Sequence, residues 1–446
     1  MSGQRNHSCS AADQQPTAGN PLAITVRPMK TKDAGAADHR RSPGATNSER
    51  QSPPACGSYE KEISVPVYLD YNATTPLLPE VLDAMLPYLR EHFGNPSSEH
   101  EIGRRARSAV EGSRQRVATI LGCSSDEIVF TAGGTEANNL AIRGVSEARP
   151  DRPHLITSAI EHPATANPCR WLERHGHRVS WIGVDGDGRV QLQDVEAALA
   201  SDITAILTIM HANNETGVVQ PIADIARLAH GRGAIVHTDA AQSVGKVPVH
   251  VDALGVDLLS IAGHKLYAPK GVGALFVRRG TPLAPLVLGA GHERGVRPGT
   301  ENVASIVGLG AACEIACRDM AEWTTRIRRL RDELWRVLRD RVPGLALNGH
   351  VEERLPNTLN VRFPRVSGTA LLAAAPEIAA STGSACHEGH ESASAVILAM
   401  GIPAAEAVGS VRLTLGRGTT DDDIVQAADV LAGAWRSITS GQLTAS

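Results

Sequence analysis

The sequence has few aromatic residues and little net charge. Phe, Tyr and Trp together make up 3% of the 446 residues, and the formal net charge at pH 7 is −4. So few aromatic side chains leave little surface on which nucleic-acid bases could stack. A slightly acidic chain also lacks the basic surface that attracts phosphate backbones and anionic lipids. We therefore expect no nucleic-acid partner and no membrane partner.

Long apolar runs and paired cysteines are lacking as well. No stretch approaches the run of about 18 apolar residues that a membrane span needs. The opening MSGQRNHSCSAADQQ has no apolar core of a secretory signal. The seven cysteines are an odd number without a Cys-x-x-Cys pair, which is typical of a reducing compartment. These observations predict a cytoplasmic protein. Cys313 and Cys317 share a helical face without a second ligand pair, so we expect two buried core thiols.

Residues 1–62 differ in composition from the rest of the chain. They are rich in Ser, Pro, Gln, Gly, Arg and Asp without apolar periodicity, which predicts a disordered extension. Acidic residues such as Asp13, Asp33 and Asp38 interrupt the basic ones and argue against a mitochondrial presequence. Met29 is an alternative start of the chain.

From Val65 onward, short β-branched runs alternate with helical stretches. The runs are continuously apolar, as in strands buried on both faces of a sheet: DEIVFT, HLITSA, HRVSWIGV, TAILTIM, AIVHTD and DLLSIAG. Helix candidates lie between them: TEANNLAIRGVSEA, QDVEAALA and PIADIARLAHGRG. This alternation predicts an α/β fold with a largely parallel sheet, in a large domain spanning residues 75–320.

The pattern changes after about residue 320. A long Arg- and Glu-rich helix, AEWTTRIRRLRDELWRVLRDRV, precedes strands such as NTLNVRF and VRLTLG. The change predicts a second, smaller α+β domain, which residues 65–74 and 321–446 form together.

A glycine-containing turn follows the predicted strand EIVF. In TAGGTEANN (131–139), Gly133 and Gly134 allow close backbone approach, and Thr135 begins a helix. The free N–H groups and the dipole of a helix start form a ready anion site. Taken alone the motif is a weak signal, because an ordinary tight turn has the same residues.

Two charged residues lie at predicted strand ends, where the ligands of parallel sheets gather. Asp239 ends the strand in AIVHTDAAQSVGK, and Lys265 follows another strand in SIAGHKLYAPKG. Singly, they indicate a helix cap and a solvated loop lysine. Together with an anion site they fit pyridoxal phosphate, which needs a Schiff-base lysine, a carboxylate on its pyridine nitrogen and a phosphate cradle. His162 in SAIEHPAT could stack on the ring, although alone it would indicate a core histidine.

Many motifs occur in a recognisable order: DYNATTP, GNPSS, TAGGTEANN, the Glu161-His162 pair, HANNETG, HTDAAQSVGK, GHKLYAPKG, RPGTEN, LPNTLN, STGSACHEG and VRLTLGRGTT. In this order they resemble the cysteine desulfurase and selenocysteine lyase family, in the class V aminotransferase group of pyridoxal phosphate enzymes. The resemblance covers roughly Val65 to Leu431, and its GHK and SxGSAC segments are highly specific. It implies a homodimer of fold type I, whose large domain holds a mostly parallel seven-stranded sheet.

The resemblance also implies roles for matching positions. Lys265 is expected to form the Schiff base, Asp239 to pair with the pyridine nitrogen, and His162 to stack on the ring and donate a proton. Other residues are expected to contact the 3-hydroxyl side or the phosphate of the cofactor: Asn214, Gln242, Gly134, Thr135, His264 and, from the second subunit, Thr300. Arg412 is expected to clamp the substrate carboxylate with its bidentate guanidinium, and Asn72 to contact the substrate.

Cys386 lies among small and polar residues in STGSACHEGHES. A thiolate that collects sulfur at a buried cofactor and hands it to an outside acceptor needs a loop that moves, and these neighbours predict one. Cys386 therefore resembles the persulfide-forming nucleophile, the competing interpretation being an incidental exposed thiol. His387 and His390 suggest a Cys-His metal site, but such a loop without a distant fourth ligand predicts no metal.

One position departs from many cysteine desulfurases, which have serine before the GHK triplet where this chain has Ala262. Selenocysteine lyases lack that serine too, and they also follow the catalytic cysteine with His. The sequence predicts a cysteine desulfurase that converts L-cysteine to L-alanine, with a selenocysteine lyase acting on L-selenocysteine as the alternative.

Two further functions stay open. An aminotransferase of the same fold would not need Cys386. A non-catalytic scaffold for a sulfur acceptor is the other, and the intact Lys265, Asp239 and Cys386 argue against it. The sequence does not name the sulfur-acceptor protein: an iron–sulfur scaffold, a tRNA-thiolation relay and a DNA-modification system all fit.

Overall fold

The computed structural model describes residues 66–200, 203–383 and 393–443. The predicted extension, residues 1–62, lies outside the described residues, and so do Cys386, His387 and His390. Within the described part of the chain, no helix is both long and apolar enough to cross a bilayer.

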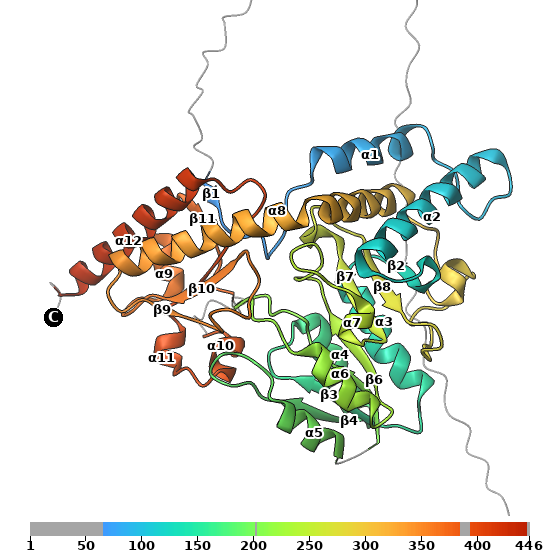
Figure 1. Cartoon of the computed structure of the whole chain (residues 1–446), viewed down its shortest axis with the longest axis horizontal. Helices are drawn as coiled ribbons and strands as arrows, with labels where there is room; N and C mark the ends of the chain where they lie inside the picture. The colour runs from blue at the N-terminus through green and yellow to red at the C-terminus, as the bar shows by residue number, and fades with distance from the viewer. Residues whose placement is uncertain (1–65, 201–202, 384–392, 444–446) are drawn as a thin grey trace, which may run out of the picture. The chain divides into compact units, whose positions relative to one another are not determined.

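Seven strands form the main sheet (Figure 1). In chain order they are β2 (Ile128–Thr131), β3 (His154–Ser158), β4 (Arg178–Ile182), β5 (Thr204–Thr208), β6 (Ile235–Asp239), β7 (Leu258–Ala262) and β8 (Gly273–Val277). Their order across the sheet is β2-β8-β7-β6-β5-β3-β4, and β8 runs in the opposite direction to the other six. The six predicted strands and the mostly parallel sheet are confirmed. The sequence does not predict β8, because its glycine-rich start favours a turn.

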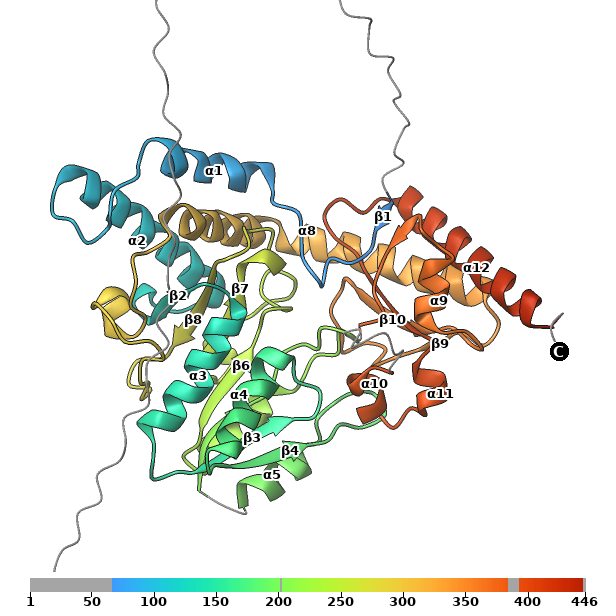
Figure 2. The same ribbon diagram turned by 180° about the vertical axis from the view of Figure 1, so that it is seen from behind.

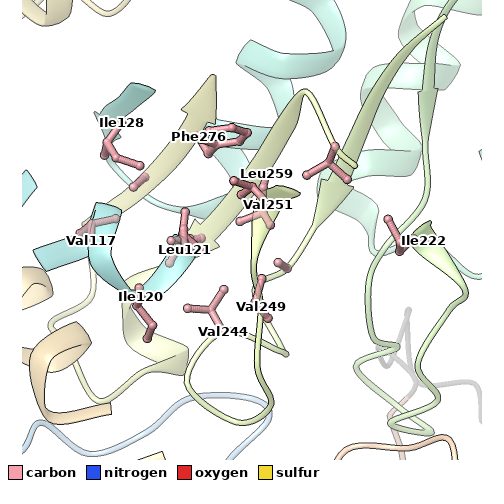
Figure 3. Close-up of a cluster of buried hydrophobic side chains, with 14 of the residues drawn as sticks. Val117, Ile120, Leu121, Ile128, Ile222, Val244, Val249, Val251, Leu259 and Phe276 are labelled. Atoms are coloured by element: carbon pink, nitrogen blue, oxygen red, sulfur yellow. The ribbon is translucent and has the colours of Figure 1, made fainter. Parts of the chain in front are cut away.

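Helices bury both faces of this sheet. One face packs against α3 (Gly134–Ala148) and α4 (Pro163–Arg174). The core on the other face takes in residues of α1 (Pro79–Arg90), α2 (Glu101–Leu121), α5 (Leu192–Ala200), α6 (Ile222–His230), α7 (Val251–Leu254) and α8 (Val303–Arg341). Neighbouring strand residues alternate between the two cores, so Leu275 packs on the α3 side while Phe276 lies with Leu121 in the other core (Figure 3). Both faces are buried, which explains the continuously apolar strand sequences.

A second core lies at the other end of α8. It is built on β1 (Val67–Tyr68), β9 (Ala346–Leu347), β10 (Thr358–Arg362), β11 (Ile378–Ala379), β12 (Ser410–Thr414), α9 (Gly368–Ala373) and α12 (Asp421–Leu443). The short helices α10 (Ala395–Ala399) and α11 (Ala404–Ala407) pack in two small separate clusters. β10 lies between β9 and β12 in an antiparallel sheet, and β1 pairs with β11 in parallel. The strand pairing therefore brings the segment around residue 70 to the C-terminal part of the chain.

Helix α8 is continuous across both cores (Figure 2). Met320 still packs against the sheet core, whereas Trp323 belongs to the second core. The division predicted at residue 320 stays a prediction, which this change of core supports. The helix begins at Val303, well before the Arg- and Glu-rich stretch that predicts it.

The two cysteines of α8 differ in exposure. Cys313 is buried in the sheet core, but Cys317 is exposed. The prediction of two buried thiols is therefore wrong for Cys317. Four residues turn a helix by about 40° beyond a full turn, which carries Cys317 out of the apolar stripe.

Candidate active site

The carboxyl ends of the parallel strands meet at one edge of the sheet, and the residues that follow them line a cavity of about 320 Å³. We call it the strand-end cavity. Both its place and its volume are typical of small-molecule sites in such sheets. Eight of the predicted site residues line it: Gly134, Thr135, His162, Asn214, Asp239, Gln242, His264 and Lys265.

Asp239, the last residue of β6, has a hydrogen bond to each carboxylate oxygen. Asn138 Nδ2 donates to Oδ2 at 2.7 Å, and the backbone N–H of Ala241 donates to Oδ1 at 2.9 Å. Both oxygens of the carboxylate are therefore held by a hydrogen-bond donor. Asn138 is a residue that the sequence analysis misses. Its position in α3 next to Asp239 depends on the packing of the helix on the sheet.

Lys265 ends the short 3₁₀ turn Gly263–Lys265 that follows β7. Its Nζ donates hydrogen bonds to the backbone carbonyl oxygens of Asn72 and, at 2.9 Å, of Ala73. Burial, and then the Arg412 guanidinium, lower the pKa of Lys265 to about 8 against the opposing charge of Asp239. A buried amine with a lowered pKa is a suitable nucleophile for a carbonyl carbon.

His162 caps the N-terminus of α4, since its Nδ1 accepts a hydrogen bond of 3.1 Å from the backbone N–H of Ala164. A backbone amide can only donate, so the neutral ring carries its proton on Nε2. Burial lowers the pKa of His162, and the charge of Lys265 adds to this while Asp239 opposes it. The arrangement gives His162 a neutral ring with an N–H group to donate.

The start of α3 leaves room for an anion. Its N-cap, Gly133, has a φ of +152°, which favours glycine, and a Cβ atom at Gly134 would lie 3.1 Å from Ala262 Cβ. The first-turn N–H groups of a helix have no acceptor within the helix. The acidic residue of this turn, Glu136, is paired with Arg297 at 2.8 Å, so its charge is neutralised.

His264 lies in the same wall of the strand-end cavity. Its Nδ1 is 3.2 Å from Thr74 Oγ1. Burial, and then the charge of Lys265, lower the pKa of His264 to about 4, so the ring is neutral near pH 7. Ala262 lines the cavity here without a hydroxyl group, as its sequence position predicts.

A second cavity of about 580 Å³ adjoins the first, and we call it the adjoining cavity. Asn72 and Arg412, the two predicted substrate residues, line it together with Lys265 and His162. Arg412 Nη2 lies 2.8 Å from Asp70 Oδ1, and its Nη1 donates to the backbone oxygen of Asn214 at 3.0 Å. Its Nε is buried and has no hydrogen-bond partner among the described residues. Arg412 therefore keeps an unused donor in the site.

Two buried carboxyl groups in the adjoining cavity have no assigned role in the sequence analysis. Burial raises the pKa of Glu161 to about 8, although Ser158 Oγ and the N–H of Met210 donate to its Oε1. Burial also raises the pKa of Glu215 to about 7, against a hydrogen bond from Ser394. Near pH 7 Glu161 is therefore mostly protonated and Glu215 about half protonated, which reduces the negative charge in this cavity.

Two predicted site residues lie outside both cavities or outside the described chain. Thr300 is exposed and lines neither cavity. Cys386 lies outside the described residues, but Gly383 and Ala393, the described residues on either side of that segment, both line the adjoining cavity. The chain therefore enters and leaves the segment with Cys386 at this cavity.

The residues of the strand-end cavity fit pyridoxal phosphate. Three groups lie around one cavity of suitable volume: the Lys265 amine with its lowered pKa, the hydrogen-bonded Asp239 carboxylate and the start of α3, which has open space beside it. The adjoining cavity adds Arg412, a cation whose buried Nε has no hydrogen-bond partner among the described residues. Fold and site together define the class of fold-type I enzymes, which carry out amino-acid chemistry with this cofactor.

Comparison with known proteins agrees with this class. Residues 67–426 match the family described as aminotransferase class-V. Cysteine desulfurase IscS of Dictyoglomus turgidum is 47% identical over 368 residues, which cover 82% of this chain and 93% of the relative. A solved NifS-like protein superposes with a TM-score of 0.77 at 35% identity, covering 82% of this chain and 98% of that one. The structure of SspA in complex with cysteine superposes with a TM-score of 0.67 at 36% identity, covering 78% and 98%. The chain belongs to the class-V aminotransferase family, in its cysteine desulfurase group.

Proposed function

We propose that this protein is a pyridoxal-phosphate-dependent cysteine desulfurase, which converts L-cysteine to L-alanine and holds the sulfur as a persulfide on Cys386. The observation that carries the proposal is the pair of Lys265 and Asp239 at adjacent strand ends, facing one cavity that continues to Arg412. The membership of the cysteine desulfurase group supports the choice of reaction.

The lining of the strand-end cavity supports the proposed cofactor-binding roles. Lys265 would hold the aldehyde carbon, Asp239 the pyridine nitrogen, and His162 the face of the ring. Asn214 and Gln242 would contact the 3-hydroxyl side, and the start of α3 with His264 would hold the phosphate. When bound, pyridoxal phosphate supplies an electron sink for negative charge at the substrate Cα.

The substrate roles follow from the adjoining cavity. Arg412 binds the carboxylate of L-cysteine through its unused Nε and one terminal nitrogen, and Asn72 contacts the substrate beside it. The amine of Lys265, once free, removes the proton from Cα; its lowered pKa keeps a useful fraction neutral near pH 7.

Sulfur transfer requires the thiolate of Cys386. It attacks the substrate sulfur, so that an S–S bond forms, the Cβ–S bond breaks, and the bonding electron pair passes to carbon. The proton that completes the methyl group of alanine comes from a nearby acid, for which the Nε2–H of His162 is our candidate. The outer sulfur of the persulfide then passes to a sulfur-acceptor protein, which regenerates the Cys386 thiolate.

We also propose a homodimer. Large apolar side chains that are 41–78% exposed lie on α1, in the segment after it and at the start of α2: Leu82, Leu89, Phe93 and Ile102. This is much exposed apolar surface for an isolated chain. The phosphate side of the site opens into a further cavity of about 750 Å³, lined by Gly134, Thr135 and His264 among others. Thr300 of a second subunit would complete the phosphate site from there. Sedimentation should show a dimer, and a fully active monomer would refute this part.

A selenocysteine lyase is the second candidate, favoured by one observation. Ala262 offers no hydroxyl group at the phosphate side, and a lyase of this family lacks it as well. An aminotransferase of the same fold would transfer the amino group to a keto acid instead. The cysteine usage of the sequence leads us to propose the cytoplasm as the location.

One experiment separates these functions. The protein loaded with pyridoxal phosphate is given L-cysteine, L-selenocysteine, or L-cysteine with a keto acid, and alanine, sulfide and selenide are measured. We expect alanine and sulfide from L-cysteine in the presence of a thiol reductant. Turnover of L-selenocysteine alone would favour the lyase, and amino transfer without released sulfide would favour the aminotransferase.

A further inference from the structure

Lys246 is a buried lysine that the proposed reaction does not use. It lies in the turn after β6, at the end of HTDAAQSVGK, and is 4% exposed. Within the described residues no carboxylate pairs with it. Burial, and then the charges of Lys265 and Arg412, hold the pKa of Lys246 well below its usual range. A buried amine without a counter-ion is costly to keep, which points to a specific task.

Both hydrogen bonds of the Lys246 amine go to side-chain amide oxygens. Its Nζ donates to Gln242 Oε1 at 2.9 Å and to Asn72 Oδ1 at 3.1 Å. Gln242 lines the strand-end cavity and Asn72 lines the adjoining cavity. Lys246 therefore forms a hydrogen bond to one lining residue of each cavity.

The orientation of the Gln242 amide follows from its partners. Its Nε2 donates to the backbone oxygen of Asn72 at 3.0 Å, and a carbonyl oxygen can only accept. Its Oε1 must therefore be the atom that faces Lys246. The second hydrogen of Nε2 has no acceptor among the described residues, and Gln242 lines the strand-end cavity. Gln242 thus has an N–H group left for a ligand.

Asn72 is held in the same way. Its Oδ1 accepts from Lys246 and, at 3.0 Å, from Asn357 Nδ2, while its own Nδ2 donates to Thr358 Oγ1 at 2.9 Å. Its backbone oxygen accepts from Lys265 Nζ as well as from Gln242. Displacing Asn72 would therefore disturb Lys265 and Gln242 together.

We propose that Lys246 is a positioning residue for the cofactor site. It holds Oε1 of Gln242 so that the amide N–H faces the 3-oxygen of bound pyridoxal phosphate. The inference rests on the proposed function, because it takes the strand-end cavity as the cofactor site.

The test is a double-mutant cycle on cofactor binding with Lys246→Met and Gln242→Met. Apoprotein is titrated with pyridoxal phosphate, and the apparent dissociation constant and the visible absorbance maximum are measured. Each single variant is expected to weaken binding about ten-fold, and the double variant is expected to be no weaker than about ten-fold, because Lys246 acts through Gln242. A double variant weakened about a hundred-fold, or a Lys246→Met protein that binds like wild type, would overturn the proposal.

Two further proteins keep the result specific. Thr324→Val removes a 3.2 Å hydrogen bond to the backbone oxygen of Lys246 but leaves its amine untouched, so it should bind the cofactor like wild type. Lys246→Arg keeps N–H donors at this position, so it is expected to restore most of the binding and the wild-type absorbance maximum. The proposal is wrong if Lys246→Arg binds the cofactor no better than Lys246→Met. If Lys246→Met fails to fold, the proposal is wrong when Lys246→Arg binds the cofactor as weakly as Gln242→Met. A wild-type protein that binds no pyridoxal phosphate would instead refute the proposed function.

Discussion

Asn138 Nδ2 donates a hydrogen bond of 2.7 Å to Oδ2 of Asp239, and both side chains are buried. The second oxygen of Asp239 accepts from the N–H of Ala241, so the carboxylate is held by donors on both sides. These two donors fix the orientation of the carboxylate at the cavity. A fixed negative charge at the end of β6 is what a protonated pyridine nitrogen requires.

Asp239→Asn is expected to retain bound pyridoxal phosphate and to lose turnover of L-cysteine by at least about 100-fold, because a preorganised charge at the reacting system disappears. Steady-state alanine formation measures this. The control is Asp252→Asn, which should retain full turnover. The Asp252 carboxylate pairs with Arg278 and is 77% exposed. Equal turnover in Asp239→Asn and wild type would contradict the role of Asp239.

The lowered pKa of Lys265 predicts a pH dependence of cofactor uptake by the apoprotein. Only the neutral amine attacks the aldehyde, and with a pKa of about 8 its fraction rises through pH 8 and levels off above it. The initial rate of uptake, followed by visible absorbance, should rise about ten-fold between pH 6 and pH 7. Lys265→Ala should develop no visible absorbance band from a bound Schiff base. A midpoint near the ordinary lysine pKa would contradict the burial of this amine.

Arg412→Met is expected to raise the KM for L-cysteine by at least about ten-fold with a smaller effect on kcat, since a charged hydrogen bond to the substrate carboxylate is lost. The matched control is Arg362→Met. Arg362 lies on the neighbouring strand β10 and lines neither cavity. If both variants show the same KM, the substrate carboxylate binds elsewhere.

A stability prediction concerns the buried ion pair of Arg114 and Glu293. The two side chains are 5% and 2% exposed, and both terminal guanidinium nitrogens, Nη1 and Nη2, bond to the carboxylate at 2.8 Å. Glu293→Ala removes the buried partner of the Arg114 charge and leaves only the largely exposed Glu111 carboxylate, 3.2 Å from Nε. It should lower the free energy of unfolding by about 3–5 kcal/mol in urea titrations. The double variant Arg114→Met with Glu293→Leu should recover much of that loss. A loss below about 1 kcal/mol in the single variant would show that the pair is solvated in solution.

Much of the sheet and part of the site follow from local sequence patterns. Continuously apolar runs identify six strands, and Asp239 and Lys265 stand where strand ends bring ligands together. The antiparallel β8 escapes prediction, because its start, GVG, has the glycine spacing of a turn. Likewise α8 is longer than predicted, since the small residues of its first half carry no strong helical pattern.

The partners of the site residues could not be predicted. Asn138 reaches Asp239 across 101 residues of chain, and Lys246 reaches Asn72 across 174. These contacts depend on the packing of α3 on the sheet and on the pairing of β1 with the C-terminal part of the chain. Neither has a signature within a single stretch of sequence. The raised pKa values of Glu161 and Glu215 arise from burial, which the sequence shows only as isolated acidic residues.

Persulfide formation on Cys386 tests the central claim most directly. Protein loaded with pyridoxal phosphate is mixed with L-cysteine, alkylated, digested and examined by mass spectrometry, while alanine is quantified in the same sample. Wild type and Cys317→Ser, which changes an exposed thiol on α8, should carry one additional sulfur on the peptide with Cys386 and form alanine. Cys386→Ala should still bind L-cysteine but form neither the persulfide nor alanine. Alanine formation by Cys386→Ala at the wild-type rate would contradict the proposed function.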